Sequence, residues 1–278
     1  MDALSELGWA SYRQATVDTW RGSTHSQTQD YIAEEVPVVL VYNTIPHVVM
    51  LTTPLNLEDF ALGFSLTEDI IKHPSELQSV RVFQRSKGVE VRITITEARF
   101  QSMSGKGRNM TGRTGCGLCG STTLEQAVRP PRPVGQGLVL DASQLTAALS
   151  QMQQQQSLNQ LTGAVHAAAW FEPERGVIAV REDVGRHNAL DKLIGALAKA
   201  NGDFNGGWLV VTSRASYEMV QKASSVGITL LAAVSAPTAL AIQLAEQCGI
   251  TLVGFARNDN HVIYTHPHRL QHHQAANV

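Results

Sequence analysis

The sequence has few cysteines, no long apolar run and almost no net charge, and each shortage excludes a class of protein. Three cysteines in 278 residues are too few for a disulfide framework, so we expect a reducing compartment. The most apolar stretch, residues 228–245, is interrupted by Ser235, Pro237 and Thr238. These interruptions predict a strand, a loop and a helix, and no membrane association is expected.

The charge of the chain excludes a second group of functions. The formal net charge is -2 at pH 7, which does not favour coating a nucleic acid or an anionic membrane by bulk electrostatics. No nucleic-acid partner is therefore expected. Residues 1–6 are acidic and lack the basic and apolar regions of a secretory signal, so we expect a cytoplasmic protein.

Length and composition predict two globular domains of the α/β class. The chain is 43% hydrophobic and 17% charged, and a domain usually holds about 100 to 200 residues. Residues 1–29 are polar and are expected to form a loosely ordered lead-in. Residues 30–103 predict a small α+β domain. Its strands are expected at 36–41, 48–52, 80–83 and 89–95, and its helix at 57–71.

A larger α/β sheet domain is expected over residues 135–265, after a glycine-rich and proline-rich segment at 104–134. A glutamine run at 153–156 is interpreted as the solvated end of a helix that begins near Ser143, and residues 266–278 as a flexible tail. The predicted strands are 165–171, 177–181, 208–211, 228–234 and 250–255, and the predicted helices are 189–200, 217–226 and 239–248.

Polar residues follow four of these strands and are expected to meet at one edge of the sheet, because its strands deliver their following loops to a common crevice. They are Glu182, Asp183, Arg186, His187 and Asn188 after the second strand; Thr212, Ser213, Arg214 and Ser216 after the third; Ser235 and Thr238 after the fourth; and Arg257, Asn258, Asp259 and Asn260 after the last. Three clusters also lie at helix N-termini, which favour phosphate. A single serine there is equally explained as a helix cap.

Cys116 and Cys119 form a Cys-x-x-Cys motif within a glycine-rich stretch, residues 115–120. Three chemistries compete for such a pair: a structural zinc site, a thioredoxin-like redox pair, and a nucleophile that receives and passes on sulfur. A zinc site needs two more ligands, and the remaining cysteine, Cys248, lies in an apolar helix where we expect a core residue.

The surroundings of the pair favour the third chemistry without excluding redox exchange. A thioredoxin-like pair follows a strand and opens a helix, whereas this one follows glycines and loop residues. Three basic residues, Lys106, Arg108 and Arg113, precede the pair with no carboxylate between them. Positive charge near a thiol favours the thiolate, and it also suits an anionic ligand.

These motifs together resemble the family of sulfur carrier proteins that serve formate dehydrogenase. The resemblance covers roughly residues 31 to 267 and is carried by several motifs in order along the chain. They are Gly115-Cys116-Gly117-Leu118-Cys119-Gly120, the stretch 181–192 from Arg181 to Lys192, the stretch 212–219 from Thr212 to Met219, Ser235-Ala236-Pro237-Thr238 and Gly254-Phe255-Ala256-Arg257.

The resemblance implies a carrier with sulfurtransferase chemistry that takes sulfur from a cysteine desulfurase as a persulfide on Cys116, assisted by Cys119. It implies delivery to Mo-bis(molybdopterin guanine dinucleotide), bound as cargo, for formate dehydrogenase. It also implies a homodimer and a second domain similar in fold to cytidine deaminases. The implied cofactor-binding residues are Phe255, Ala256, Arg257, Asn258, Asp259 and Asn260, with His187 and Arg214 from the neighbouring clusters.

One departure from the family pattern and two alternatives qualify this interpretation. Family members often have glycine and a basic residue where this chain has Asn258, Asp259 and Asn260. The resemblance therefore implies that the cofactor binds at this position, through the backbone and not through these side chains. A zinc-dependent deaminase would need His-x-Glu and Pro-Cys-x-x-Cys, and the sequence has neither. A non-catalytic chaperone that binds the molybdenum cofactor remains the alternative function.

Overall fold

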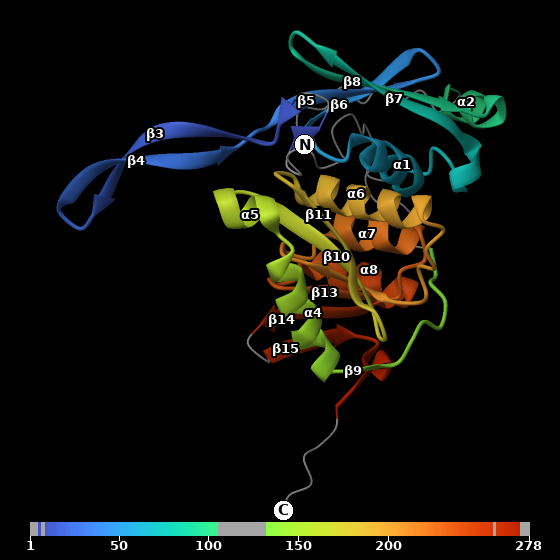
Figure 1. Cartoon of the computed structure of the whole chain (residues 1–278). Coiled ribbons are helices and arrows are strands. Elements are labelled where there is room, and N and C mark those ends of the chain that lie inside the picture. The colour runs from blue at the N-terminus through green and yellow to red at the C-terminus, as the bar shows by residue number, and fades with distance from the viewer. Residues whose placement is uncertain (1–4, 7–8, 105–131, 258–259, 273–278) are drawn as a thin grey trace, which may run out of the picture.

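The computed structural model describes residues 5–6, 9–104, 132–257 and 260–272, and arranges them as two sheet-containing units that pack against each other (Figure 1). The small unit precedes the large one in the chain, and the α/β class is confirmed. No helix among the described residues is long and apolar enough to cross a membrane.

The first unit is a four-stranded sheet of order β6-β5-β8-β7 with helix α1 against one face (Figure 1). Strands β5 and β8 are parallel, and the other neighbours are antiparallel. Alternation of buried and exposed side chains along the strands places one face on the core. The bounds are β5 (Val36–Tyr42), β6 (Ile45–Thr52), α1 (Leu57–Thr67), η1 (Pro74–Glu76), β7 (Leu77–Arg85), β8 (Gly88–Ile95) and α2 (Glu97–Ser104).

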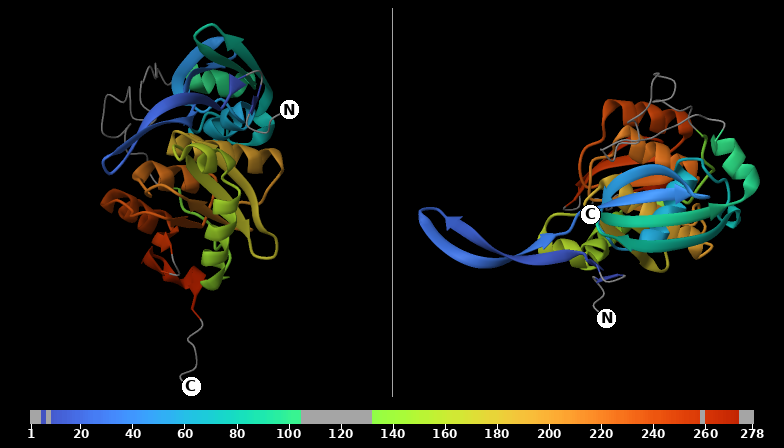
Figure 2. Two further views of the ribbon diagram at one scale, coloured as in Figure 1. Left: turned by 60° about the vertical axis from the view of Figure 1, so that its left-hand side comes forward. Right: turned by 90° about the horizontal axis from the view of Figure 1, so that it is seen from above.

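A long hairpin of β3 (Tyr12–Arg21) and β4 (Thr24–Ala33) precedes this sheet. Strand β4 contacts α5 (Ser157–Thr162), and the tip of the hairpin projects away from both units (Figure 2). The strands pair along their whole length, from Tyr12 opposite Ala33 to Arg21 opposite Thr24. The expectation of a loosely ordered lead-in over residues 1–29 is therefore wrong for the hairpin. The hairpin strands were not predicted because their side chains are mostly polar and show no hydrophobic alternation. Backbone hydrogen bonds between the strands, and not burial of side chains, define them. Short strands β1 (Ser5–Glu6) and β2 (Trp9–Ala10) pair ahead of it.

The second unit is a six-stranded sheet of order β11-β10-β12-β13-β14-β15. Strands β12, β13 and β14 are parallel, whereas β10 runs opposite to both of its neighbours and β15 runs opposite to β14. The bounds are β10 (His166–Glu172), β11 (Gly176–Asp183), β12 (Trp208–Val211), β13 (Leu230–Ala233), β14 (Thr251–Arg257) and β15 (Asn260–Thr265).

Helices cover both faces of the large sheet. Alternate side chains of β10 point to opposite faces: Ala168 and Trp170 belong to the core shared with α6, α7 and α8, while Ala167 and Ala169 pack with α4. The sequence predicted α4, α6, α7 and α8 to within a few residues of their ends, and it did not predict α5. The bounds are α4 (Ser143–Gln154), α5 (Ser157–Thr162), α6 (Arg186–Lys199), α7 (Tyr217–Ser225) and α8 (Ala239–Cys248).

The described end of the chain is anchored to the second unit. Strand β16 (Leu270–Gln271) follows η2 (Pro267–Arg269) and pairs with β9 (Leu140–Asp141). Arg269 is 5% exposed and donates hydrogen bonds to the carbonyls of Gln136 and Gly249, among others. The predicted flexible tail is therefore wrong for residues 266–272. The sequence did not indicate this anchoring, because the Arg269 side chain and the two-residue strand β16 are too short a feature to produce a periodic hydrophobic pattern.

The two units meet where α1 crosses α6 with the backbones almost in contact. A Cβ atom on Gly63 would lie 1.7 Å from the carbonyl oxygen of Asp191, and one on Gly195 would lie 1.8 Å from that of Asp59. Only glycine permits this approach. Apolar residues on both sides of the crossing belong to one continuous core, so the two units share their hydrophobic interior.

Buried charges also join the units. Lys192 is fully buried, and its Nζ lies 2.6 Å from Asp183 Oδ2 and donates to the carbonyl of Thr53 in the first unit. Lys222 Nζ lies 2.9 Å from Asp191 Oδ2 and 3.0 Å from Glu68 Oε1. Burial alone would lower the pKa of Lys222, but Asp191 and Glu68 raise it, so this lysine is held as a cation.

Candidate functional site

The carboxyl ends of β11, β12, β13 and β14 lie at the same edge of the large sheet. Strand β11 points the same way as β12 because both are antiparallel to β10, and β12, β13 and β14 are parallel. The four polar clusters that follow these strands therefore share one edge, as the sequence predicted. They do not all face the same space, however, and the structure divides them into two groups.

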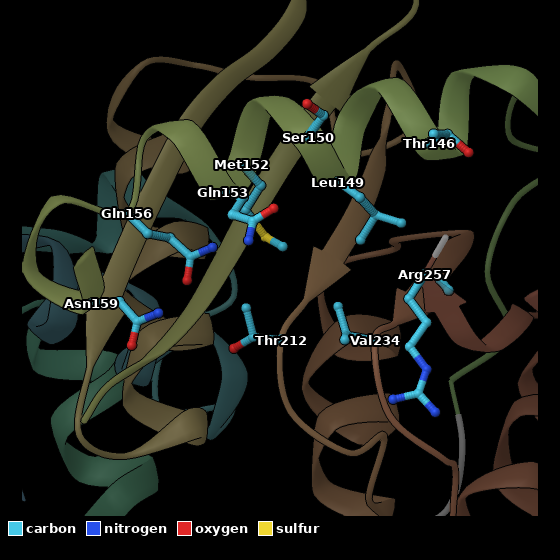
Figure 3. A pocket seen from close by; sticks show the side chains of 11 residues that line it. Thr146, Leu149, Ser150, Met152, Gln153, Gln156, Asn159, Thr212, Val234 and Arg257 are labelled. Atoms are coloured by element: carbon cyan, nitrogen blue, oxygen red, sulfur yellow. The ribbon is translucent and has the colours of Figure 1, made fainter. Parts of the chain in front are cut away.

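A pocket of about 460 Å³ opens at this edge, between the sheet and helices α4 and α5 (Figure 3). Its floor comes from the ends of β12, β13 and β14, and its opposite wall from α4, the turn after α4, and α5. It is lined by Thr146, Leu149, Ser150, Met152, Gln153, Gln156, Asn159, Thr212, Val234, Ala256 and Arg257. A pocket of this size accommodates a small organic ligand.

The predicted stretch at the end of β14 is partly in this pocket. Ala256 and Arg257 line it, whereas Asn260 is exposed at the start of β15 and is not among the lining residues. Phe255 is 38% exposed and has a φ of 52°, a left-handed backbone that is uncommon for an aromatic residue. Asn258 and Asp259 lie outside the described residues. Strained backbone at the rim of a pocket is typical of functional sites.

His187 and Arg214 share the edge but do not line the pocket. His187 is buried at the start of α6, with its Nε2 2.8 Å from Oε2 of Glu218 on α7. Arg214 is exposed on the loop that follows β12. Direct contact of both with a ligand in the pocket stays a prediction from the resemblance. The contact that the structure gives His187 is with another side chain of the protein.

The carboxylates after β11 hold the structure together. Asp183 is fully buried and accepts hydrogen bonds from the backbone of Thr53 and Gly185, beside its pairing with Lys192. Glu182 accepts hydrogen bonds from the backbone nitrogens of Leu158 and Asn159 at the start of α5, at 2.9 and 2.8 Å. Burial raises the pKa of Glu182, although these two donors oppose the rise. Both carboxylates thus position elements of the site without lining it.

The serine and threonine residues of the other clusters have mixed roles. Thr238 caps α8 by accepting a hydrogen bond from the backbone of Ala241, which is the plain alternative to ligand binding. Ser216 occupies the N-cap position of α7 but forms no capping hydrogen bond with its side chain. Thr212 lines the pocket, and its Oγ1 accepts a hydrogen bond from the backbone of Ala167 on β10.

Sequence reasoning missed the wall that α4 and α5 contribute. The glutamine run was interpreted as a solvated helix end, which is correct for Gln154 and Gln155 but wrong for Gln156. Gln156 is 4% exposed and lines the pocket, as do Gln153 and Asn159. The signal available was helical spacing, since 149, 152, 153 and 156 fall on one face of a helix.

The family follows from comparison with known proteins. The model of the FdhD/NarQ family matches residues 33–271, which is most of the chain. The chain belongs to the FdhD/NarQ family. The protein named sulfur carrier protein FdhD from Cupriavidus necator is 52% identical over 256 residues, covering 92% of this chain and 89% of that protein. The protein of the same name from Xanthomonas euvesicatoria pv. vesicatoria is 50% identical over 255 residues, covering 92% and 91%.

The fold of this FdhD/NarQ chain is also found in a crystal structure. A formate dehydrogenase accessory protein from Desulfotalea psychrophila superimposes with a TM-score of 0.77 at 20% identity, covering 94% of this chain and all of that one. At this identity the likeness establishes the fold. Because 94% of this chain is covered, the likeness extends over both units.

The Cys-x-x-Cys motif of this FdhD/NarQ chain, Cys116 and Cys119, lies outside the described residues. Arg99 on α2 and Arg132, one on each side of the undescribed stretch 105–131, meet at Asp69, just after α1. Arg99 donates to the carbonyl oxygen of Asp69 at 3.3 Å, and Nη2 of Arg132 lies 2.8 Å from its Oδ1. Partial burial opposes ionisation of Asp69, but its pairing with Lys72 and Arg132 holds its pKa below the ordinary value.

Other candidate reactive groups in the described part of the chain have structural roles. Cys248 is 1% exposed, and burial raises the pKa of its thiol, which confirms the predicted core residue. Burial, with the nearby Arg186 and His187, lowers the pKa of His166 at the start of β10 and keeps its ring neutral at pH 7. The described ranges contain no group of three or more histidine, cysteine or acidic residues arranged to hold a metal.

Proposed function

We propose that this protein is a cytoplasmic sulfur carrier for formate dehydrogenase. In this proposal Cys116 receives sulfur from a cysteine desulfurase as a persulfide, and the sulfur passes to Mo-bis(molybdopterin guanine dinucleotide) held as substrate. Membership of the FdhD/NarQ family and about 50% identity to proteins named sulfur carrier protein FdhD support the carrier role. The observation that carries the substrate assignment is the pocket at the carboxyl edge of the sheet, with Arg257 available to an anionic group.

The proposed sulfur loading is a thiol exchange. The Cys116 thiolate attacks the outer sulfur of the desulfurase persulfide, the new S–S bond forms on Cys116, and the desulfurase cysteine leaves as a thiolate. Attack requires the thiolate form, which the preceding Lys106, Arg108 and Arg113 favour by positive charge. No metal or redox cofactor is consumed in this step, because the sulfur keeps its oxidation state.

The proposed release uses the second cysteine as the reductant. The Cys119 thiolate attacks the inner sulfur of the Cys116 persulfide, a Cys116–Cys119 disulfide forms, and the outer sulfur leaves as hydrosulfide. The electron pair that displaces the sulfur comes from the Cys119 thiolate, and two equivalents of a cellular thiol then reduce the Cys116–Cys119 disulfide and become a disulfide themselves. The molybdenum of the substrate accepts the sulfide in exchange for an oxygen ligand.

Mass spectrometry of the intact protein tests the proposal. After incubation with a cysteine desulfurase and cysteine, the wild type is expected to gain the mass of sulfur on Cys116. The Cys116→Ala variant is expected to gain none, and Cys119→Ala is expected to load but to release no sulfide. An adduct of equal size in Cys116→Ala would contradict the proposal. Normal formate dehydrogenase maturation by a double Cys→Ala variant would favour the non-catalytic chaperone.

We also propose that the carrier works as a homodimer, a prediction that rests on the family resemblance. Light scattering after size-exclusion chromatography measures the mass directly. A species of twice the chain mass of 30.1 kDa is expected at micromolar concentration, and a monomer would contradict the proposal.

A further inference from the structure

The pocket contains one buried amide that no described residue satisfies. Gln156 is 4% exposed, lines the pocket, and has a buried Oε1 to which no described group of the protein donates a hydrogen bond. Buried side-chain oxygens in folded proteins nearly always accept a hydrogen bond. The unpaired acceptor therefore points to a donor that a bound molecule supplies.

The lining residues divide the pocket into three parts. Gln156 and Asn159 lie at one end, Arg257 lies at the other, and apolar side chains such as Met152 and Val234 lie between them (Figure 3). Apolar walls suit the faces of a flat ring, the amide end suits its polar edge, and a guanidinium suits phosphate. The arrangement matches a molecule with a heterocyclic base at one end and an anion at the other.

We propose that Gln156 is a specificity-determining residue that reads the edge of a purine base, with its Oε1 accepting a hydrogen bond from a ring N–H. This inference rests on the proposed function, in which the substrate carries guanine nucleotides. Guanine presents two adjacent donors on its Watson–Crick edge, the N1–H and the 2-amino group, whereas adenine presents an acceptor at N1. An oxygen positioned to accept from the ring N1–H therefore prefers guanine to adenine, whose donor on that edge is the 6-amino group.

The glutamine run supplies a matched control. Gln154 lies in the same run, is exposed, and is not among the lining residues. Gln156→Met removes the acceptor while keeping the length of the side chain, and Gln154→Met makes the same chemical change outside the pocket. An apolar side chain in place of an unpaired buried amide leaves the unliganded protein as stable or more stable, so lost binding is distinguishable from lost folding.

Calorimetric titration of the full chain with three probes tests the inference. The wild type is expected to bind GDP more tightly than IDP, which lacks the 2-amino group, and to bind ADP most weakly. Gln156→Met is expected to lose about tenfold or more in GDP affinity and most of the preference for GDP over ADP. Gln154→Met is expected to match the wild type, and thermal unfolding without nucleotide is expected to show no loss in either variant.

Two outcomes would overturn the inference and separate it from the proposed function. If Gln156→Met and the wild type bound GDP with equal affinity, Gln156 would have no part in recognition, although the pocket could still bind a nucleotide. If the wild type bound none of the three probes, or all three equally, the pocket would not discriminate between bases. Sulfur loading of Cys116, measured independently, would still decide the carrier function in either case.

Discussion

At the scale of single residues, two glycines determine how the halves of the molecule fit. Gly63 and Gly195 let α1 and α6 cross without side chains between them, and a Cβ atom at either position would overlap a carbonyl oxygen of the other helix. An alanine normally stabilises a helix relative to glycine by about 1 kcal/mol. Here the overlap is with backbone, which cannot rotate away, so the steric cost exceeds that gain.

Gly195→Ala is therefore expected to destabilise the protein by about 1–3 kcal/mol or more, because α6 must move away from α1. Urea unfolding followed by circular dichroism measures the change. Gly206→Ala is the control, because a Cβ atom there would first meet Asp203 at 3.4 Å, an ordinary contact distance. Equal stability of the Gly195→Ala variant and the wild type would contradict the close crossing.

Single residues also show where sequence reasoning reached its limit. The periodicity around Cys248 correctly predicted a core residue, because burial of a whole helix face is a local pattern. Helical spacing groups Gln156 with Leu149 and Met152 on one face, but it does not show what that face packs against. The role of Gln156 was not predictable, because it depends on α4 lying over the ends of β12 and β14.

At the scale of elements, the short helix α5 depends on a carboxylate from the sheet. Glu182 accepts both free backbone N–H groups at the start of α5, and α5 presents Asn159 to the pocket. An isolated helix of six residues is unstable in water, so this helix needs such an acceptor. Glu182, one of the polar residues predicted at the crevice, thus supports a wall of the pocket without lining it.

Glu182→Ala is expected to destabilise the protein by about 1 kcal/mol, the usual cost of losing a helix cap. It is also expected to weaken GDP binding, because Asn159 loses its support. Glu182→Gln keeps an acceptor oxygen at the same place and is expected to lie between the wild type and Glu182→Ala. Urea unfolding and titration with GDP measure the two effects. Full GDP affinity in Glu182→Ala would contradict the supporting role.

The turn after α1 predicts a pH dependence. The pKa of Asp69 is held below its ordinary value, so the folded state favours the carboxylate. The sign follows from linkage: the stabilisation is complete above the ordinary carboxyl pKa of about 3.9 and is lost as the pH falls through the folded pKa.

The stability difference between the wild type and Asp69→Asn is therefore expected to be constant near neutral pH and to shrink below about pH 4. Urea unfolding at a series of pH values measures it. Glu58, which is more than half exposed and pairs with Lys199, offers a control at Glu58→Gln. A difference that grows as the pH falls would contradict the lowered pKa.

Among the elements, regular α/β segments were predictable and the hairpin was not. Strand β12 and helix α8 begin and end where the sequence predicted, because apolar runs bounded by glycine and polar loops are local signals. The β3–β4 hairpin has polar side chains on both faces, so its alternation carries no hydrophobic contrast. Strand β15 was missed because it lies at the sheet edge, half exposed.

At the scale of the whole molecule, two sheets do not mean two independent folding units. The core runs without interruption from β5 and β8 through α1 and α6 to α7 and α8. The hydrogen bond from buried Lys192 to the carbonyl of Thr53 and the buried ion pair of Lys222 with Glu68 cross the same boundary. The domain division at residues 104–134 therefore describes topology, and the stability of each unit depends on the other.

Thermal unfolding is accordingly expected to show one transition, with equal calorimetric and van't Hoff enthalpies. Lys222→Met is expected to cost about 3–5 kcal/mol, because it leaves Asp191 and Glu68 buried without their cation. It should lower the midpoint of that single transition and not split it. Two resolved transitions in differential scanning calorimetry would contradict the shared core.

The meeting of Arg99 and Arg132 at Asp69 bears on the kinetics of delivery. Arg99 and Arg132, which lie on either side of Cys116 in the sequence, both contact this one residue of the first unit. Under the proposed function, Cys116 belongs to the same chain as the pocket, so the sulfur and its acceptor meet within one complex. Delivery is then insensitive to dilution, whereas loading by a separate desulfurase slows in proportion to it.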